Sequence, residues 1–250
     1  MRMHSNTIFI TGGSSGIGKG LAEAFHKLGN QVIISGRRAE RLQDNCAANP
    51  GMRHSVLDVT DPGAIRDVSA QVLREFPRLN CVINNAGIQR RLNLSAGFDD
   101  RAVTNEINTN LLGVIRVAAA FIPHLMKQEN GVLINVSSGL AFVPMAGQPV
   151  YCATKAAVHS LTLSLRHQLK SSGVKVVELI PPWVETELGG VSKTGRRPAG
   201  RGPMPLDAFI EAAMRELAGD ADEVAIAQAK NLVAASCPET VKKVFDSMNP

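Results

Sequence analysis

Short apolar runs alternate along the chain with longer segments whose apolar residues recur every three to four positions. The short runs predict strands at residues 7–11, 31–35, 53–57, 80–84, 131–136 and 174–180. The longer segments predict helices at residues 17–28, 38–47, 63–75, 99–127, 151–171 and 206–217. Such alternation is typical of a parallel sheet with right-handed crossovers and helices on both faces. We therefore expect one doubly wound α/β domain over residues 1–250, with six strands and a seventh as the alternative.

The C-terminal part of the chain keeps a helical pattern. Apolar residues after Leu206 recur at helical spacing, and no glycine-flanked seventh strand can be located among them. We expect a helical segment over residues 218–250. Before it, residues 188–206 are rich in glycine, proline and basic side chains and hold neither acidic nor aromatic residues. This composition predicts a loop, and the missing aromatic residues argue against nucleic-acid binding.

Bulk composition is that of an ordinary globular protein. Hydrophobic residues make up 44% of the 250 residues, and no apolar run is long enough to cross a bilayer. The first residues carry no signal-peptide pattern, so we expect a cytoplasmic location and no membrane partner. The cysteines form no C-x-x-C pair, which favours reduced thiols over disulfides or metal ligands. They are Cys46, Cys81, Cys152 and Cys237.

A glycine-rich turn follows the first predicted strand. It reads Gly12, Gly13, Ser14, Ser15, Gly16, Ile17 and Gly18, and a predicted helix comes next. Glycine lets a pyrophosphate approach the helix N-terminus, where free N–H groups and the helix dipole favour anions. An ordinary strand-to-helix loop is the alternative, but the position directly after the first strand favours dinucleotide binding.

A tyrosine and a lysine lie four residues apart on the predicted helix 151–171. Tyr151 and Lys155 therefore share one face of that helix, and Ser138 stands thirteen residues before the tyrosine. A cation near a phenol favours the phenolate and lowers its pKa toward neutrality. The alternative is a pair of amphipathic side chains that cover apolar surface. Ser138 follows the predicted strand 131–136, at the edge where open α/β sheets place their ligands.

Together these segments resemble the short-chain dehydrogenase/reductase family. The resemblance extends over about residues 5–188, with the motifs in the family's order. They are residues 11–18, residues 84–87, Asn110, Ser138, and Tyr151 with Lys155. The family implies a single Rossmann-type domain, a nicotinamide cofactor and hydride transfer between a carbonyl and an alcohol. It also implies a substrate lid after the sixth strand, here at about residues 188–217.

The resemblance implies a role for each of four catalytic residues, Asn110, Ser138, Tyr151 and Lys155. Ser138 would hydrogen-bond the substrate oxygen, and Tyr151 would act on that oxygen as acid or base. Lys155 would hold the nicotinamide ribose and lower the pKa of Tyr151. Asn110 would distort its helix and hold a water that links Lys155 to solvent. Asn108 is the alternative, and Asn110 is preferred because Gly113 follows it at the family's interval.

Cofactor choice depends on the end of the second strand. A carboxylate there would hold the adenosine ribose and select NAD, but this chain has Gly36 followed by Arg37. Arginine is suited to a 2′-phosphate, so we favour NADP over NAD, with a solvent-facing Arg37 as the alternative. Asp58 matches the family's adenine contact, although it could instead cap the next helix, as could Thr60 or Asp61.

The family's remaining cofactor contacts fall at the ends of later strands. Residues 84–87 would form a backbone shelf beside the cofactor ribose, with a plain turn as the alternative. Thr186 would contact the carboxamide or phosphate region, and Pro182 replaces the family's usual glycine. The full set that we expect is Gly12, Ser14, Ser15, Gly16, Ile17, Gly18, Arg37, Asp58, Val59, Asn84, Ala86, Gly87, Tyr151, Lys155, Pro181 and Thr186.

We therefore expect an NADP(H)-dependent oxidoreductase that acts on a small carbonyl or alcohol substrate. The alternatives are an NAD-linked alcohol dehydrogenase and a non-catalytic NADP(H)-binding regulator of the same fold. The intact asparagine, serine, tyrosine and lysine set argues against a regulator, which needs only the nucleotide site. The resemblance also implies a homodimer built on the predicted helices 99–127 and 151–171, with a homotetramer as the alternative.

Overall fold

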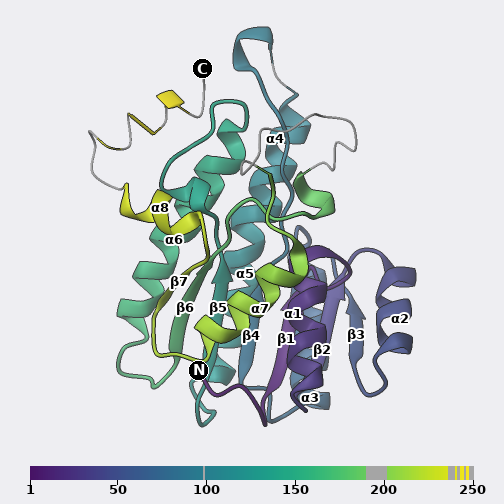
Figure 1. Ribbon diagram of the computed structural model, residues 1–250. Helices are drawn as coiled ribbons and strands as arrows, with labels where there is room; N and C mark the ends of the chain where they lie inside the picture. Colours follow the sequence, from purple (N-terminus) through teal and green to yellow (C-terminus); the bar gives the residue numbers. More distant parts are fainter. Residues whose placement is uncertain (98, 190–201, 236–239, 241–242, 245, 248–250) are drawn as a thin grey trace.

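One parallel sheet organises the chain (Figure 1). The computed structural model describes residues 1–97, 99–189, 202–235, 240, 243–244 and 246–247. Within them, seven strands lie in the order β3-β2-β1-β4-β5-β6-β7, and all neighbouring strands are parallel. The strands are β1 (Thr7–Thr11), β2 (Gln31–Gly36), β3 (Arg53–Val56), β4 (Cys81–Asn84), β5 (Val132–Val136), β6 (Lys175–Ile180) and β7 (Glu223–Ala225). The six predicted strands are confirmed.

Helices cover both faces of the sheet, as the alternating pattern predicts. α1 and α7 pack together on one face, and α3 and α5 pack together on the other (Figure 1). The helices are α1 (Gly16–Lys27), α2 (Ala39–Ala48), α3 (Pro62–Glu75), α4 (Asp100–Ile107), α5 (Gly113–Leu125), α6 (Pro149–Gln168), α7 (Leu206–Leu217) and α8 (Ala229–Ala234). This is the doubly wound Rossmann-type arrangement.

Strand β1 divides its side chains between two hydrophobic cores. Ile8 and Ile10 belong to the core under α1 and α7, whereas Phe9 belongs to the core under α3 and α5. The division follows from the two-residue period of a strand, which sends successive side chains to opposite faces. The Phe9 ring stacks on Phe121 of α5 with ring centroids 4.9 Å apart.

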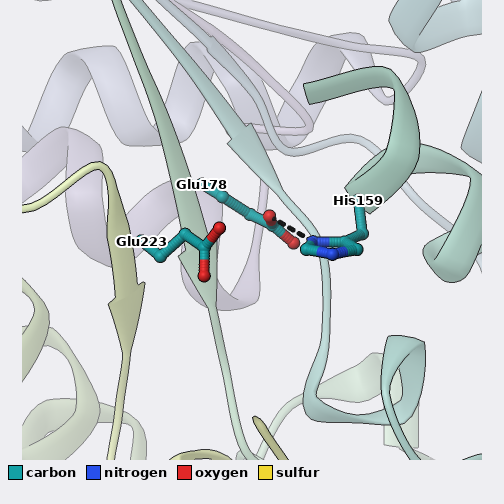
Figure 2. Close-up of side chains that lie close together, drawn as sticks. All are labelled: His159, Glu178 and Glu223. Atoms are coloured by element: carbon teal, nitrogen blue, oxygen red, sulfur yellow. Dashed lines mark hydrogen bonds and ion pairs between the residues drawn. The ribbon is translucent and has the colours of Figure 1, made fainter. Parts of the chain in front are cut away.

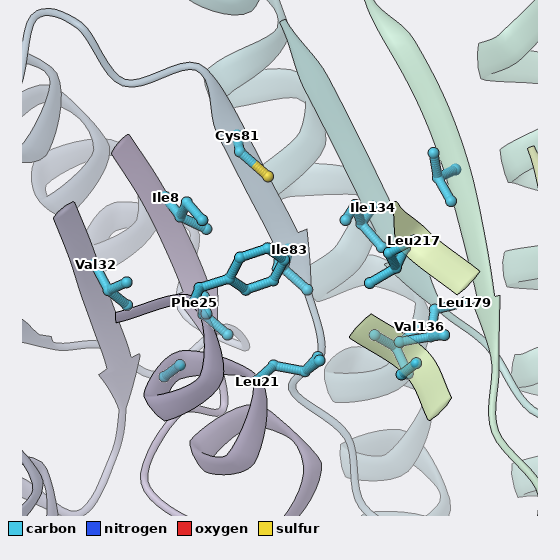
Figure 3. Packing of buried hydrophobic residues seen from close by; sticks show 14 of the residues in the cluster. Ile8, Leu21, Phe25, Val32, Cys81, Ile83, Ile134, Val136, Leu179 and Leu217 are labelled. Carbon is cyan, nitrogen blue, oxygen red and sulfur yellow. The ribbon is translucent and has the colours of Figure 1, made fainter. Parts of the chain in front are cut away.

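Figure 3 shows the first of these cores. Leu21 and Phe25 of α1 point at the sheet, among side chains of β1, β2 and β4, and Leu217 of α7 covers the neighbouring strands. Phe25 has no exposed surface, and its burial stabilises the fold by about 1.5–3 kcal/mol. Both helices are therefore held to the sheet by ordinary apolar packing.

Strand β7 corrects the expectation of a helical segment over residues 218–250 and is the seventh strand that was kept as the alternative. Glu223–Ala225 pair with β6, from Glu178↔Glu223 to Ile180↔Ala225. A strand of three residues is too short to show alternation in the sequence, so the apolar spacing around Val224 resembled that of a helix. Pairing with the exposed edge of β6 determines its structure instead. A helix does follow, at α8.

The segment expected to form a substrate lid, at about residues 188–217, has two parts. Residues 190–201, with the basic side chains of the predicted loop, lie outside the described residues. Residues 206–217 form α7, whose Phe209, Ala213 and Leu217 are buried. The described part of the segment therefore contributes to the core of the domain.

The winding of the sheet reverses between β1 and β4. The chain proceeds outward from β1 to β3 on one side and from β4 to β7 on the other. Open α/β sheets bind their ligands at the carboxyl ends of the strands beside such a switch point. The glycine-rich turn follows β1 and residues 84–87 end and follow β4, so both predicted motifs lie there.

Candidate active site

The glycine-rich turn after β1 has a shape that requires glycine at several positions. Gly12 and Gly16 have φ angles of 70° and 53°, in the left-handed region. A Cβ on Gly18 would lie 2.4 Å from the Gly12 carbonyl oxygen, which no side chain tolerates. A Cβ on Gly16 would lie 3.3 Å from the Thr186 side chain. The turn thus brings bare backbone close to the segment that follows β6.

The N-terminus of α1 offers donors for an anion. Ser15 stands at the N-cap but makes no side-chain capping hydrogen bond, and the first turn contains no acidic residue. The first N–H groups of a helix lack intrahelical partners and carry the positive end of the dipole. Together with the close backbone approach at Gly16 and Gly18, this donor set fits the pyrophosphate of a dinucleotide.

Hydrogen bonds fasten residues 84–87 to the glycine-rich turn. The Thr11 hydroxyl accepts from the N–H groups of Asn85 (3.0 Å) and Ala86 (3.1 Å). The Asn85 side-chain amide donates to the carbonyls of Thr11 (3.0 Å) and Gly12 (3.3 Å). Sequence reasoning placed Thr11 and Asn85 in the motifs but gave neither a role. The structure shows that they hold the two segments in register.

Asn84 supports this edge from inside the core. Its side chain is 1% exposed and donates to Asn135 Oδ1 of the adjacent strand at 2.9 Å. Asn135 in turn donates to Thr162 Oγ1 of α6 at 2.9 Å. A buried chain of polar groups therefore connects β4, β5 and α6. The amide nitrogen of Asn84 is used inside the core, and its buried Oδ1 has no hydrogen-bond partner among the described residues. Its backbone remains for the expected cofactor shelf.

Arg38, rather than Arg37, reaches the glycine-rich turn from the end of β2. Its Nη2 donates to Ser15 Oγ at 2.6 Å and to Ser14 Oγ at 3.2 Å. Its Nη1 donates to Glu187 at 2.8 Å, and Arg41 contacts the same carboxylate at 2.5 Å. Arg37 is exposed to solvent. Sequence reasoning missed Arg38, Arg41 and Glu187, although the second basic residue after Gly36 was a visible signal.

Asp58 lies after β3 at the same edge of the sheet. Its Oδ1 accepts hydrogen bonds from the Thr60 N–H (2.9 Å) and hydroxyl (2.8 Å). The N-cap of α3 is Asp61, which accepts from the N–H groups at the start of that helix. This excludes the capping alternative for Asp58. Val59 is buried, and a Cβ on Gly113 would lie 3.0 Å from it.

Asn110 sits in a break of the predicted helix 99–127. Residues Asn108–Leu112 form a π-helical turn between α4 and α5, so the distortion that the resemblance implies is present. The fully buried Asn110 side chain accepts from the Ile88 N–H and donates to the Ile88 carbonyl, both at 2.8 Å. It also donates to Thr154 Oγ1 of α6 at 3.2 Å. Asn110 therefore links α6 to the segment after β4.

Ser138 and Tyr151 meet at the carboxyl edge of β5. Ser138 lies two residues after the end of the strand, and its hydroxyl accepts from the Leu140 N–H at 3.1 Å. Tyr151 lies in the first turn of α6, and its hydroxyl is hydrogen-bonded to Ser138. Their exposed fractions are 8% and 6%. The structure thus brings together two groups that are thirteen residues apart in sequence.

Lys155 completes the cluster from the next turn of α6. Its Nζ lies 5.7 Å from the centre of the Tyr151 ring and donates to the Val136 carbonyl at 2.8 Å. A Cβ on Gly87 would lie 3.8 Å from this Nζ and 3.4 Å from Asn110 Oδ1. The four predicted catalytic residues therefore lie in one cluster, with Asn110 and Lys155 next to Gly87.

Burial controls the ionisation of both titratable groups. It raises the pKa of Tyr151 well above its ordinary value, and the hydrogen bond with Ser138 only partly opposes this. It lowers the pKa of Lys155 to about 8, with the charge of Glu178 acting in the opposite direction. Desolvation of the phenol is therefore the largest influence on its pKa in this structure, and the effect of Lys155 on Tyr151 stays a prediction.

A charged network anchors the second half of α6 to the sheet (Figure 2). His159 Nδ1 lies 2.7 Å from Glu178, which is fully buried on β6. Arg166 lies 3.5 Å from Glu223 of β7 and donates to the Val176 carbonyl at 3.2 Å. Donor atoms of His159, Glu178 and Glu223 lie within 4.8 Å of one another, a spacing that could hold a metal ion. Each carboxylate has one nitrogen partner, while the buried Oε1 of Glu178 has no hydrogen-bond partner among the described residues. We interpret the network as an anchor that positions Tyr151 and Lys155.

The segment after β6 returns to the glycine-rich turn. The Pro181 carbonyl accepts from the Gly139 N–H at 3.0 Å, so this position holds the turn after Ser138. Thr186 faces Gly16, where the resemblance places a cofactor contact. Trp183 is 52% exposed, which excludes a role as a core aromatic residue.

Polar contacts join the segment after β4 to α4 and to the start of α6. Gln89 Nε2 donates to Gln148 Oε1, joining the segment after β4 to the start of α6. Glu106 of α4 is 2% exposed and accepts from the Arg90 N–H at 3.2 Å. Burial raises the pKa of Glu106, and its charge also raises the pKa of Tyr151. Sequence reasoning missed Glu106, because nothing in its neighbourhood marks it as buried.

The fold and the site define a nicotinamide-dinucleotide oxidoreductase of the Rossmann type. The family model described as short chain dehydrogenase matches residues 6–196. The chain therefore belongs to the short-chain dehydrogenase family. None of the helices in the described part of the chain has the length and hydropathy that a membrane span requires.

Three comparisons place the chain within this family. It is 44% identical over 194 residues to the uncharacterised oxidoreductase DltE of Bacillus subtilis, covering 77% of each chain. It is 34% identical over 196 residues to serine 3-dehydrogenase of Agrobacterium fabrum, covering 78% of each. A short-chain dehydrogenase of Burkholderia cenocepacia, solved in complex with NADP, superposes with a TM-score of 0.84 at 26% identity over 99% of each chain.

Proposed function

We propose that this chain is an NADP(H)-dependent oxidoreductase that transfers a hydride between the nicotinamide and a small carbonyl or alcohol substrate. The convergence of Asn110, Ser138, Tyr151 and Lys155 beside Gly87 carries the proposal. The nicotinamide, when bound, would supply or accept the hydride. The remaining chemistry is the movement of one proton and the stabilisation of one oxygen, and both fall to this cluster.

Ser138 and Tyr151 would hold the reacting oxygen between their hydroxyls. A carbonyl oxygen gains negative charge as it is reduced, and two hydroxyl donors stabilise that charge in a desolvated site. Tyr151 with a raised pKa is a neutral phenol at pH 7. It can therefore give its proton to an alkoxide, which is a much stronger base than a phenolate. In the oxidation direction the same group would accept the proton.

Lys155 and Asn110 would position these groups. A Lys155 ammonium with a pKa of about 8 remains mostly charged at neutral pH, so it stabilises negative charge that develops on Tyr151. Asn110 fixes the backbone of Ile88 against α6. Arg166 and His159 hold the other half of that helix. Both halves of α6 are therefore held in place, and this fixes the position of Tyr151 relative to Gly87.

Charge at the adenosine end supports NADP over NAD. The chain has Gly36 where a carboxylate would bind the ribose hydroxyls. Arg38 contacts Ser14 and Ser15, and Arg41 lies beside it on the same Glu187 carboxylate, so two guanidinium groups lie where a 2′-phosphate would bind. The Burkholderia cenocepacia neighbour was solved with NADP. We assign Arg38 to the 2′-phosphate in preference to the predicted Arg37.

The Tyr151→Phe variant tests the catalytic assignment. Loss of the hydroxyl should lower turnover by about 10²–10⁴-fold, which is the usual contribution of a positioned acid or base. NADPH binding, measured by calorimetry, should stay within about twofold, because the ring and its packing are kept. A screen of aldehydes, ketones, quinones, keto acids and sugars for NADPH oxidation supplies the substrate, with serine tested as an NADP-reducing alcohol. Turnover that survives in the variant would reject the role of Tyr151.

The same screen separates the two alternatives. An NAD-linked alcohol dehydrogenase would bind NAD at least as tightly as NADP in parallel titrations. A non-catalytic regulator would bind NADPH and turn over no substrate in the screen.

We also propose a homodimer built on α4, α5 and α6, because Ile107, Ile115 and Leu163 on these helices are exposed apolar residues. The mass in solution tests this part.

A further inference from the structure

The carboxylate of Glu187 occupies the arginine pair at the adenosine end. Glu187 Oε2 lies 2.8 Å from Arg38 Nη1, and Oε1 lies 2.5 Å from Arg41 Nη1. The three side chains are 57%, 43% and 46% exposed, respectively. The two hydrogen bonds from the arginines hold the pKa of Glu187 below its ordinary value, so it remains charged at neutral pH. The residue follows Thr186 directly, beside the glycine-rich turn.

Arg38 has few donors left when these contacts are made. Its Nη1 faces Glu187, and its Nη2 faces the hydroxyls of Ser14 and Ser15. A guanidinium binds a phosphate through two parallel N–H groups, the same geometry that it uses for a carboxylate. A 2′-phosphate and Glu187 would therefore require the same edge of Arg38. Both are anions, so they also repel each other.

We propose that Glu187 is a specificity-determining residue that competes with the 2′-phosphate for Arg38 and Arg41. The inference rests on the proposed NADP(H) function and extends it. Glu187 lowers the affinity for NADP selectively, because NAD has no phosphate at this position and leaves the ion pairs intact. The arginines are thus neutralised until a ligand with greater negative charge replaces the carboxylate.

The Glu187→Gln variant tests this inference by equilibrium calorimetry. Removing one carboxylate that pairs with two exposed arginines should tighten NADP binding about three- to tenfold while NAD binding changes less than about twofold. The same pattern should hold for 2′,5′-ADP against 5′-AMP, which differ in the 2′-phosphate alone and lack the nicotinamide. The matched control is Glu185→Gln, two residues earlier. Glu185 is an exposed carboxylate that forms no ion pair within the described ranges.

The quantity that decides the test is the ratio of the NADP affinity to the NAD affinity in each variant. A ratio that rises in Glu187→Gln but not in Glu185→Gln supports the inference. An unchanged or lower ratio overturns it, and a lower ratio would mean that Glu187 organises the arginines for the phosphate. In an Arg38→Ala, Arg41→Ala background, Glu187→Gln should have no selective effect, because its partners are gone.

Failure of the inference can be distinguished from failure of the proposed function. If NADP binds tightly and its binding depends on Arg38, but Glu187→Gln leaves the ratio unchanged, only the inference fails. If the Arg38→Ala, Arg41→Ala protein keeps its NADP and NAD affinities, the assignment of the 2′-phosphate site fails first. If Tyr151→Phe retains turnover, the catalytic assignment fails whatever the binding data show.

Discussion

The two ends of the site differ in how they hold charge. At the proposed reaction end, Tyr151 and Lys155 are less than a tenth exposed, and their polar atoms bond to groups within the domain. At the adenosine end, Arg38 and Glu187 are about half exposed and pair with each other across the turn. Charge is therefore desolvated at one end and screened by water at the other.

The difference in solvation determines what each end can contribute. A desolvated group interacts strongly with developing charge but costs stability, as the lowered pKa of Lys155 shows. A solvated ion pair is worth little in stability, yet its partners can be exchanged at low cost. The reaction end is suited to catalysis and the adenosine end to selection among cofactors. Substitutions at the two ends should therefore affect different quantities.

Lys155→Met should show the largest effects, a loss of turnover together with a gain in stability. Turnover should fall by about 10²–10⁴-fold, because the charge that assists Tyr151 is lost. Stability at pH 7 without cofactor should rise by about 1–3 kcal/mol, because each pKa unit of depression costs about 1.4 kcal/mol and the lost hydrogen bond to Val136 offsets only part of this. Chemical denaturation and NADPH-oxidation assays measure the two quantities.

The stability gain should also depend on pH in one direction. The folded-state pKa of Lys155 is about 8 and lies below the ordinary value of 10.5. The unfolded chain therefore binds more protons between these values, and this group makes the wild type more stable as the pH rises through them. The advantage of Lys155→Met should be full below pH 8 and nearly absent above pH 10.5. An advantage independent of pH would mean that packing, not desolvation, is responsible.

Asn110→Ala should affect both stability and turnover, by somewhat less than Lys155→Met. It removes two hydrogen bonds to Ile88 and one to Thr154, leaving buried backbone groups unpaired at a cost of about 2–4 kcal/mol. Turnover should fall as well, because Gly87 and α6 lose their connection. Asn108→Ala is the matched control: Asn108 lies in the same π turn, and among the described residues its side chain makes no hydrogen bond. Equal effects in both variants would contradict the proposed role of Asn110.

Much of the fold and most of the reaction end could be predicted from the sequence, because both depend on local patterns. Buried parallel strands are continuous apolar runs, and the proposed catalytic groups occupy motifs of fixed spacing. Strand β7 could not be predicted, because three residues show no period and its pairing with β6 is a tertiary contact. Likewise, spacing predicted that Lys155 lies near Tyr151 but not that burial would dominate the pKa of both groups.

The adenosine end was harder to predict because its contacts join distant segments. Arg38 and Glu187 are 149 positions apart, and no local pattern pairs them. The motif glycines could be predicted because the backbone geometry of the turn requires them. Gly36 could be read because it stands where a carboxylate would bind the ribose. The choice between Arg37 and Arg38 depends on which side chain points at the turn. Sequence spacing alone leaves that choice open, and the structure favours Arg38.

Arg38→Ala should give the smallest effect and the most selective one. NADP binding should weaken about tenfold relative to NAD, which corresponds to one charge-assisted hydrogen-bond pair on a partly solvated phosphate. The free energy of unfolding should change by less than about 0.5 kcal/mol, because the side chain is exposed and its ion pair is screened. The difference between NADP and NAD affinities should also shrink as salt rises from low to physiological concentration. Arg37→Ala, which removes the exposed neighbour, is the matched control. A larger loss of NADP affinity in Arg37→Ala than in Arg38→Ala would assign the 2′-phosphate to Arg37, the residue that the sequence predicted. A loss of stability in Arg38→Ala would contradict the comparison of the two ends, because the exposed end would then also contribute to the stability of the fold.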